Sequence, residues 1–207
     1  MKHLLDQSNV VVDVGSNRGQ FIDSILSSVE CSIIAIEPEP MSFSILKSKY
    51  RAHKNIELFS VALGEDNAMG QLQIANNDGQ SSSLLNFSNL HLLGAPKINM
   101  VQEASVEIRR FSDLLHFKPG SKIFIKIDVQ GYELHVLKGI SEEHWNMIFA
   151  IRLECNLVET YIGAAKIEDV FALLRKKGLV PYRIEPGFGM PDFGQQLQME
   201  VLFKRIN

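Results

Sequence analysis

The sequence contains few cysteines, no long apolar run and no extended basic cluster. Among its 207 residues there are only two cysteines, Cys31 and Cys155. Two thiols without a metal-ligand spacing cannot build a disulfide framework, so we expect both to be reduced and buried. No apolar run approaches the roughly 20 residues that cross a bilayer, and residues 1–5 are too short for the core of a signal peptide. These absences predict a soluble, cytoplasmic protein that has no membrane partner.

The charges are nearly balanced, with 21 basic and 24 acidic residues and a formal net charge of -3. The longest basic cluster is Arg175-Lys176-Lys177, at the end of a predicted helix, where cations favour the negative end of the helix dipole. No stripe of Lys and Arg is present that would hold a phosphate backbone. We therefore expect no nucleic-acid partner.

Apolar residues alternate between strand spacing and helix spacing along the chain. Strands are predicted at residues 9–14, 32–36, 56–61, 71–74, 105–110, 122–129, 147–156, 179–184 and 198–204. Helices are predicted at residues 18–29, 41–50, 132–138 and 166–177, and a Gly/Pro-rich loop at residues 186–194. This alternation predicts an α/β fold, a doubly wound and mostly parallel sheet with an antiparallel C-terminal strand. No linker divides residues 1–207, which indicates a single domain.

Residues 76–104 lack a clear period and contain three consecutive serines, Ser81, Ser82 and Ser83. A stretch of this length without regular elements is either disordered or functional. We expect it to form a lid over the substrate.

The first predicted strand ends in Asp13-Val14-Gly15-Ser16-Asn17-Arg18-Gly19. Gly15 permits a tight turn, and Gly19 lets the following helix pack closely. Asn17 occupies the middle glycine position of the G-x-G-x-x-G dinucleotide fingerprint, so the loop is not built for close approach of a pyrophosphate. Such a loop suits a nucleoside cofactor without phosphate, of which S-adenosylmethionine is one.

Glu37 ends the second predicted strand. An acidic residue at this place can accept hydrogen bonds from both ribose hydroxyls of a bound nucleoside. The alternative is that Glu37 only caps the helix that follows. The acid and the first glycine also fit an NAD-dependent oxidoreductase, and a catalytically silent binding domain of the same fold is a third interpretation.

Two later strands carry polar residues where buried strands should be apolar. Lys126 and Asp128 share one face of one strand, and Arg152, Glu154 and Asn156 share a face of the next. Because buried charges need partners, we expect Lys126 to pair with Glu154. A purely structural ion pair is the alternative to a role in the chemistry.

These segments resemble the FkbM family of methyltransferases. The matching residues are Val12 to Gly19, Ile36-Glu37-Pro38, Val61-Ala62-Leu63-Gly64, Ser82-Ser83-Leu84 and, most specifically, Ile125 to Glu133. The resemblance implies a class I, Rossmann-like methyltransferase fold, S-adenosylmethionine as cofactor and O-methylation as the activity. It implies cofactor contacts from Asp13, Gly15, Ser16, Asn17, Gly19, Glu37, Pro38 and Ala62. Ser16 departs from the alanine that the family often has.

A hydroxyl acceptor needs help to lose its proton, either from a general base or from a divalent metal held by carboxylates. We expect Asp128 and Glu154 to contribute to the acceptor site, with Lys126 positioning them. Two carboxylates would suit Mg²⁺, and they would serve equally as base and orienting group. His91, in the expected lid, is a further candidate base, whereas His135 is expected at the surface. The expected acceptor is a small molecule, a sugar or polyketide-like metabolite.

Overall fold

The computed structural model describes residues 1–190 and 194–206. Part of the loop predicted at residues 186–194 therefore lies outside the described residues. The strands are β1 (Val10–Val14), β2 (Ser32–Ile36), β3 (Ile56–Phe59), β4 (Ala62–Gly64), β5 (Ala68–Ala75), β6 (Met100–Arg110), β7 (Ile123–Ile127), β8 (Ile148–Asn156), β9 (Leu179–Pro186) and β10 (Gln198–Arg205). The helices are α1 (Lys2–Leu5), α2 (Gln20–Leu26), α3 (Pro40–Tyr50), α4 (Asn89–Gly94), α5 (Phe111–Leu114), α6 (Glu133–Lys138), α7 (Glu142–Met147) and α8 (Ile167–Lys176).

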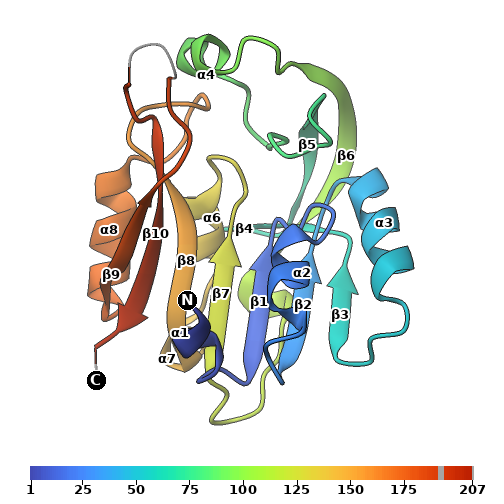
Figure 1. Cartoon of the computed structure of the whole chain (residues 1–207), viewed down its shortest axis with the longest axis vertical. Coiled ribbons are helices and arrows are strands. Elements are labelled where there is room, and N and C mark those ends of the chain that lie inside the picture. Colours follow the sequence, from blue (N-terminus) through green and yellow to red (C-terminus); the bar gives the residue numbers. More distant parts are fainter. Residues whose placement is uncertain (191–193, 207) are drawn as a thin grey trace.

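A seven-stranded sheet forms the centre of the molecule, in the order β3-β2-β1-β7-β8-β10-β9 (Figure 1). Strands β1, β2, β3, β7 and β8 pair in parallel, and β10 runs antiparallel to both of its neighbours. The predicted α/β fold with an antiparallel C-terminal strand is confirmed. The order of the strands reverses between β1 and β7, and in open sheets of this kind ligands bind outside the carboxyl ends of the strands at such a point.

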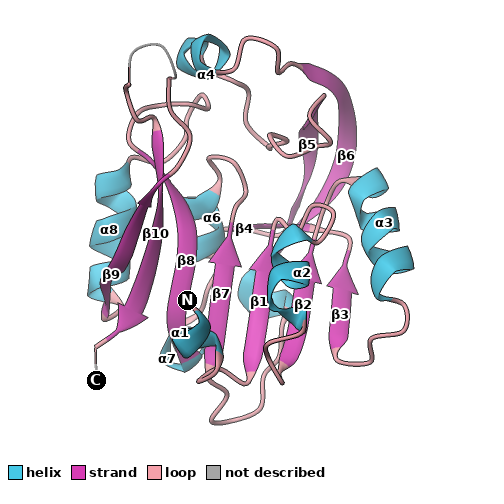
Figure 2. Ribbon diagram, viewed as in Figure 1, coloured by secondary structure: helices cyan, strands magenta, loops and turns pink. Residues whose placement is uncertain are grey.

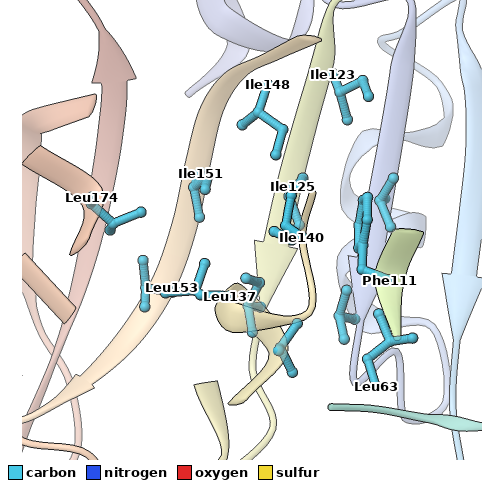
Figure 3. Close-up of a cluster of buried hydrophobic side chains, with 14 of the residues drawn as sticks. Leu63, Phe111, Ile123, Ile125, Leu137, Ile140, Ile148, Ile151, Leu153 and Leu174 are labelled. Carbon is cyan, nitrogen blue, oxygen red and sulfur yellow. The ribbon is translucent and has the colours of Figure 1, made fainter. Parts of the chain in front are cut away.

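Helices cover both faces of this sheet because its central strands are apolar on both sides (Figure 2). On one face, side chains of α5 to α8 pack against Val12, Ile125 and Ile151. Figure 3 shows this cluster, in which Leu137, Ile140 and Leu174 approach the strands. On the other face, α1, α2 and α3 pack against Val11 and Phe124. Consecutive residues of one strand, such as Val11 and Val12, therefore pack against helices on opposite faces of the sheet.

A second sheet of three strands, β4-β6-β5, extends from the main one, and it changes the interpretation of residues 76–104. Strand β6 begins at Met100 rather than near Ser105, because its first half pairs with β5. The segment also contains α4, whose first turn is capped by the Ser88 hydroxyl. The short helices α1, α4, α5 and α7 were not predicted, since four to six residues are too few to show a helical period.

Within residues 1–190 and 194–206, no helix is both long and apolar enough to cross a membrane.

Gly15 sits where β1 and β7 come closest at the switch point. The Asp128 amide donates to the Val14 carbonyl (3.0 Å), and this hydrogen bond holds the segments that follow β1 and β7 close together. The backbone of Gly15 has a φ of +77°, and a Cβ on this residue would overlap the Asp128 carbonyl oxygen. Only glycine both adopts this positive φ readily and has no Cβ that would overlap the Asp128 carbonyl oxygen.

We predict that Gly15→Ala destabilises the protein by about 1–3 kcal/mol more than Gly120→Ala. Gly120 is the matched control, because it has a similar φ of +81° but open space around its Cβ position. The left-handed backbone costs about 1–2 kcal/mol in both variants. Urea unfolding without ligand measures the difference. Equal destabilisation of the two variants would contradict the close approach at Gly15.

Candidate active site

A cavity of about 670 Å³ opens at the carboxyl ends of the central strands. The loops that follow β1, β2 and β7 form one part of its wall, and the ends of β8 and β10 form another. Residues 77–84 and helix α4 close a further side. The cavity therefore lies where the topology of the sheet predicts a ligand.

The loop after β1 is tied to β2 through Ser16. The Ser16 hydroxyl donates to the Asp13 carbonyl (2.8 Å) and accepts from the Ile36 amide (3.2 Å). Asn17 follows with a positive φ of 45°, and its side chain donates to the Asp78 carbonyl (2.9 Å). Gly15, Ser16 and Asn17 line the cavity. Gly19 does not, since it packs against Tyr50, whose hydroxyl donates to the Gly19 carbonyl (2.9 Å).

Glu37 places a buried carboxylate in the cavity wall at the end of β2. Its Oε2 accepts from the Asn17 amide (2.6 Å), and its Oε1 accepts from the Glu39 amide (2.8 Å). Burial raises the pKa of Glu37 to about 7. The cap of α3 is Glu39, whose carboxylate accepts from the amides of Met41 and Ser42, so Glu37 is not the cap residue of this helix. Pro38 and Ala62 line the cavity nearby.

Lys126 carries an ammonium group that is almost fully buried between two carboxylates. Its Nζ lies 3.2 Å from Asp13 Oδ1 and 3.4 Å from Asp128 Oδ2, and it donates to the Gly15 carbonyl (3.3 Å). Burial disfavours the ammonium, but the two carboxylates outweigh this effect and raise the Lys126 pKa. Asp13 is 0 % exposed and does not line the cavity, so it supports Lys126 from beneath.

The expected pairing of Lys126 with Glu154 is wrong. In the sheet, Lys126 stands in register with Asp13 of β1 on one side and with Arg152 of β8 on the other. The fully buried Asp13 needs a counter-charge and takes the ammonium, while Arg152 pairs with Glu200 of β10 (Nε to Oε2, 2.6 Å). The polar face therefore spans four strands, from β1 to β10, and not two.

Glu154 meets amide groups instead of a cation. Its Oε2 accepts from the side chains of Gln198 (2.8 Å) and Gln130 (3.1 Å). Burial, reinforced by the nearby carboxylate of Asp128, raises the pKa of Glu154 well above its ordinary value. Asp128 and Glu154 thus lie in one cavity wall, and of the two it is Asp128 that contacts the Lys126 ammonium.

Gln130 connects this wall to the segment expected to form a lid. It has a φ of +56°, and its side-chain amide donates to Asp128 Oδ1 (2.7 Å) as well as to Glu154. The Tyr161 hydroxyl donates to Gln130 Oε1 (2.5 Å), and the Ser83 hydroxyl donates to the Gln130 carbonyl (2.7 Å). Ser83, within residues 76–104, therefore contacts the backbone of the same residue whose side chain binds both carboxylates.

The three other residues considered from the sequence lie in different places. Glu133, at the start of α6, is buried behind the cavity wall and accepts from the amides of Val129 (3.2 Å) and Gly131 (3.1 Å). His135 stacks on Tyr132 and faces Glu65 away from the cavity. His91 is 3 % exposed and lines the cavity.

Sequence reasoning missed Gln130, Gln198 and Glu200 as lining residues. Gln198 and Glu200 lie on the last strand, where alternating polar residues look like an ordinary half-exposed strand. Only the antiparallel pairing of β10 with β8 brings Glu200 opposite Glu154. Gln130 lies within residues 125–133, the segment that most specifically resembles the FkbM family, and this position was the sequence feature that pointed to it.

The composition of the wall limits what the cavity can hold. The cations among the described lining residues are Lys126 and Arg152, and both are paired with carboxylates, so neither is free for a phosphate. Within the described part of the chain, no group of three or more His, Cys, Asp or Glu side chains is arranged to hold a metal ion. The wall suits a ligand with hydroxyl groups and without phosphate.

Comparison with known families supports this description. Residues 13–181 match the model of the methyltransferase FkbM domain. This range includes the loop after β1, Glu37 and the whole of β7 and β8.

Two curated fungal proteins are similar over most of the chain. Methyltransferase 1 of Beauveria bassiana (strain ARSEF 2860) is 26% identical over 211 residues, which cover 95% of this chain and 81% of that protein. Methyltransferase sdnD of Sordaria araneosa is 26% identical over 205 residues, which cover 85% of this chain and 77% of that protein.

Solved structures share the fold at low sequence identity. A putative S-adenosylmethionine-dependent methyltransferase from Listeria monocytogenes superposes with a TM-score of 0.55 at 8% identity, over 100% of this chain and 96% of the other. TrmK of M. capricolum, solved with S-adenosylhomocysteine, has a TM-score of 0.53 at 8% identity, over 99% of this chain and 65% of the other. At this identity the likeness establishes a common fold.

We predict that Glu133→Gln makes the protein more stable at pH 8 than the wild type, by about 1–3 kcal/mol. Burial raises the pKa of Glu133 to about 7 from an ordinary 4.5, so the folded protein keeps a proton that the unfolded chain has lost. Folding therefore binds protons between these two pH values, and the stability contributed by this group falls as the pH rises through that window. Glutamine keeps an acceptor for the two backbone amides and does not titrate.

Urea unfolding of both proteins at pH 5 and pH 8 measures this effect. Glu168→Gln, exposed in the first turn of α8, is the control, and it should leave the pH dependence unchanged. A Glu133→Gln variant with the same pH dependence as the wild type would contradict a raised pKa.

Proposed function

The chain belongs to the FkbM methyltransferase family and is an S-adenosylmethionine-dependent methyltransferase, and we propose that it methylates a hydroxyl group of a small-molecule acceptor. The observation that carries the proposal is the Asp128 carboxylate, which lines the cavity and is held by Lys126 and Gln130. The named matches are methyltransferases, which leaves the nicotinamide and silent-domain interpretations without support.

The cofactor belongs at the end of the cavity formed by the loops after β1 and β2. Gly15, Ser16 and Asn17 would face it with backbone, and Glu37 would accept from the ribose hydroxyls, with Pro38 and Ala62 beside them. Asp13 and Gly19 would act from behind, by fixing Lys126 and the start of α2. The fit rests on a buried carboxylate at the end of β2 and on lining cations that are already paired. When bound, the cofactor supplies an electrophilic methyl group.

The acceptor belongs beside the carboxylates at the ends of β7 and β8. Asp128 would take the proton of the acceptor hydroxyl, which increases the electron density on the attacking oxygen. Lys126 would hold the Asp128 carboxylate in position before it acts. Glu154, whose pKa burial raises well above its ordinary value, would lie beside the acceptor and orient it by hydrogen bonding.

This assignment favours a route without a metal. Lys126 Nζ lies 3.4 Å from one oxygen of Asp128, and the Gln130 amide donates to the other. An ammonium group at that distance repels a divalent cation, which prefers several free oxygen ligands. Mg²⁺ held by Asp128 and Glu154 is the alternative that a chelator tests.

In this proposal, residues 1–207 act as one methyltransferase unit, because the cavity takes its lining from positions 14 to 200. Residues 76–104 would cover the acceptor, and the contacts of Ser83 and Tyr161 with Gln130 would place that cover on the catalytic wall. The polar wall suits a sugar or a polyketide-like metabolite that bears several hydroxyl groups.

Glu37→Gln should weaken the binding of S-adenosylhomocysteine by about 1–3 kcal/mol, the range for hydrogen bonds to a charged group. Glutamine retains one acceptor but cannot accept from two ribose hydroxyls in the same way. Titration calorimetry measures the affinity. Glu39→Gln, two residues further and outside the cavity lining, should bind within about twofold of the wild type. Unchanged affinity in Glu37→Gln would remove that residue from the cofactor site.

Asp128→Asn should lower kcat by about 10²–10⁴-fold, the range for loss of a general base. The assay measures methyl transfer to a panel of sugars, hydroxylated lactones, amines and thiols, with and without chelator. Asp169→Asn on the exposed face of α8 is the control and should retain full activity. Affinity for S-adenosylhomocysteine, measured in parallel, should be unchanged in both variants.

Three outcomes of this assay decide separate points. Methylation confined to amines or thiols would refute the hydroxyl assignment. Full activity of Asp128→Asn would exclude that carboxylate as the base. Loss of activity with chelator, restored by Mg²⁺, would replace the metal-free route with a metal-assisted one.

A further inference from the structure

Residues 77–83, which we call the strap, cross the cavity between β5 and α4. The residues of the strap line the cavity, with the exception of Asp78. Asp78 and Gln80 are exposed, so a single layer of chain separates the cavity from solvent at the strap. Figure 1 shows this segment, which follows β5, above the carboxyl ends of the central strands. A ligand that enters or leaves on this side must therefore pass the strap.

The end of the strap near β7 is firmly anchored. The Ser83 hydroxyl donates to the Gln130 carbonyl (2.7 Å), and the backbone of Ser83 makes two hydrogen bonds with that of Gln73 (2.8 and 3.0 Å). Ser83 is 1 % exposed, and the Tyr161 hydroxyl lies 3.2 Å from the Ser81 carbonyl oxygen. Buried hydrogen bonds of this kind open only together with the structure around them, so this end is the fixed one.

The opposite end of the strap is held by two contacts at the surface, both made by Asp78. Its carboxylate pairs with Arg18 (Oδ1 to Nη2, 3.0 Å), and its carbonyl accepts from the Asn17 side chain (2.9 Å). The Asp78 side chain is 63 % exposed, and its backbone has a φ of +60°, which is uncommon outside glycine. Because exposed ion pairs contribute little stability, this is the end that releases.

Hydrogen bonds within the strap keep its shape between the two ends. The Asn77 side chain donates to the Ser81 hydroxyl (2.9 Å) and accepts from the Ser81 amide (3.1 Å). The Ser82 hydroxyl accepts from the Ala75 amide (3.0 Å), and the Ser82 amide donates to the Gly79 carbonyl (3.1 Å). The strap is therefore a preformed loop, and release of its exposed end displaces it as one piece.

We propose that the strap is a gate for the cofactor, and that the ion pair of Arg18 with Asp78 is its latch. The latch attaches the strap to the loop after β1, the loop assigned above to the cofactor, and Asn17 of that loop lines the cavity. S-adenosylmethionine enters, and S-adenosylhomocysteine leaves, when Asp78 releases Arg18 and Asn17. This inference rests on the proposed position of the cofactor and is independent of the methyl acceptor.

The latch lies outside the cavity, because neither Arg18 nor Asp78 is among the lining residues. The pair therefore joins the strap to the loop without touching a molecule inside the cavity. Such a latch sets how often the strap opens, so weakening it accelerates entry and exit by the same factor and leaves the affinity unchanged. Loss of a direct contact with the cofactor would instead act mainly on the dissociation rate.

Asp78→Asn should raise both the association and the dissociation rate constants of S-adenosylhomocysteine about two- to fivefold, with Kd within about twofold of the wild type. Asparagine tolerates a positive φ and removes the charge of the latch. Surface plasmon resonance measures both rate constants. Arg18→Gln should have the same effect, and the double variant should add nothing further. Asp169→Asn on the exposed face of α8 is the control and should match the wild type.

Salt gives a second readout of the latch, because it screens an exposed ion pair. Raising the ionic strength should accelerate exchange in the wild type and should have less effect in Asp78→Asn. A rise in the dissociation rate alone in Asp78→Asn, with a matching loss of affinity, would overturn the latch. Exchange at the wild-type rates in Asp78→Asn would overturn it as well.

A reversible crosslink tests the gate itself. The variant Arg18→Cys with Asp78→Cys is loaded with labelled S-adenosylhomocysteine and treated with a short bis-methanethiosulfonate, which joins the two thiols through bonds that a reductant cleaves. The crosslinked protein should retain the label in excess unlabelled ligand, and reductant should restore its release. Wild-type protein treated with the same reagent is the control for the native thiols of Cys31 and Cys155. Release of the label from the crosslinked protein at the wild-type rate would overturn the gate.

The outcomes separate the gate from the proposed function. If Glu37→Gln leaves the affinity for S-adenosylhomocysteine unchanged while the crosslink still blocks exchange, the placement of the ribose fails and the gate stands. If Glu37→Gln weakens binding and the crosslinked protein exchanges freely, the gate fails and the cofactor site stands. Neither result depends on the methyl acceptor, since both measurements use S-adenosylhomocysteine alone.

Discussion

The buried ammonium of Lys126 connects the fully buried Asp13 of β1 with Asp128 in the wall of the cavity. It lies between Asp13 and Asp128 and also donates to the carbonyl of Gly15, so one charge holds the ends of β1 and β7 together at the switch point. Removing one partner from such a buried pair typically costs about 3–5 kcal/mol, because the remaining charge stays in the interior. The loop after β1 and the Asp128 carboxylate after β7 therefore share one contact, the Lys126 ammonium.

Polar side chains then continue across the sheet as a connected series. Arg152 pairs with Glu200, and Glu154 accepts from two glutamine amides. The same arrangement gives the carboxylates of Asp128 and Glu154 different environments. Asp128 faces an ammonium, whereas Glu154 is buried among amides and other acids, which raises its pKa. Pairs of acids placed in contrasting environments are a common basis for dividing acid and base roles.

Ser83 and Tyr161, which lie outside the main sheet, contact this series of polar side chains at Gln130. Gln130 receives the Tyr161 hydroxyl and donates to both Asp128 and Glu154, and Ser83 donates to its carbonyl. Tyr161 also contacts the ring of His91. Ser83, within residues 76–104, and Tyr161 are therefore connected to both carboxylates through Gln130.

The sequence by itself determined the layers of the fold and the placement of the glycine loop and Glu37 at the carboxyl ends of their strands. Buried parallel strands need residues that are apolar on both faces, and the glycine loop and Glu37 follow their strands directly, so local spacing was sufficient. The partner of Lys126 was decided only by the tertiary structure, because it depends on β1 lying beside β7. The same holds for Gln198 and Glu200, which reach the cavity through the antiparallel pairing of β10 with β8. Strand order is a property of the whole chain, and no local pattern encodes which buried charge will face which.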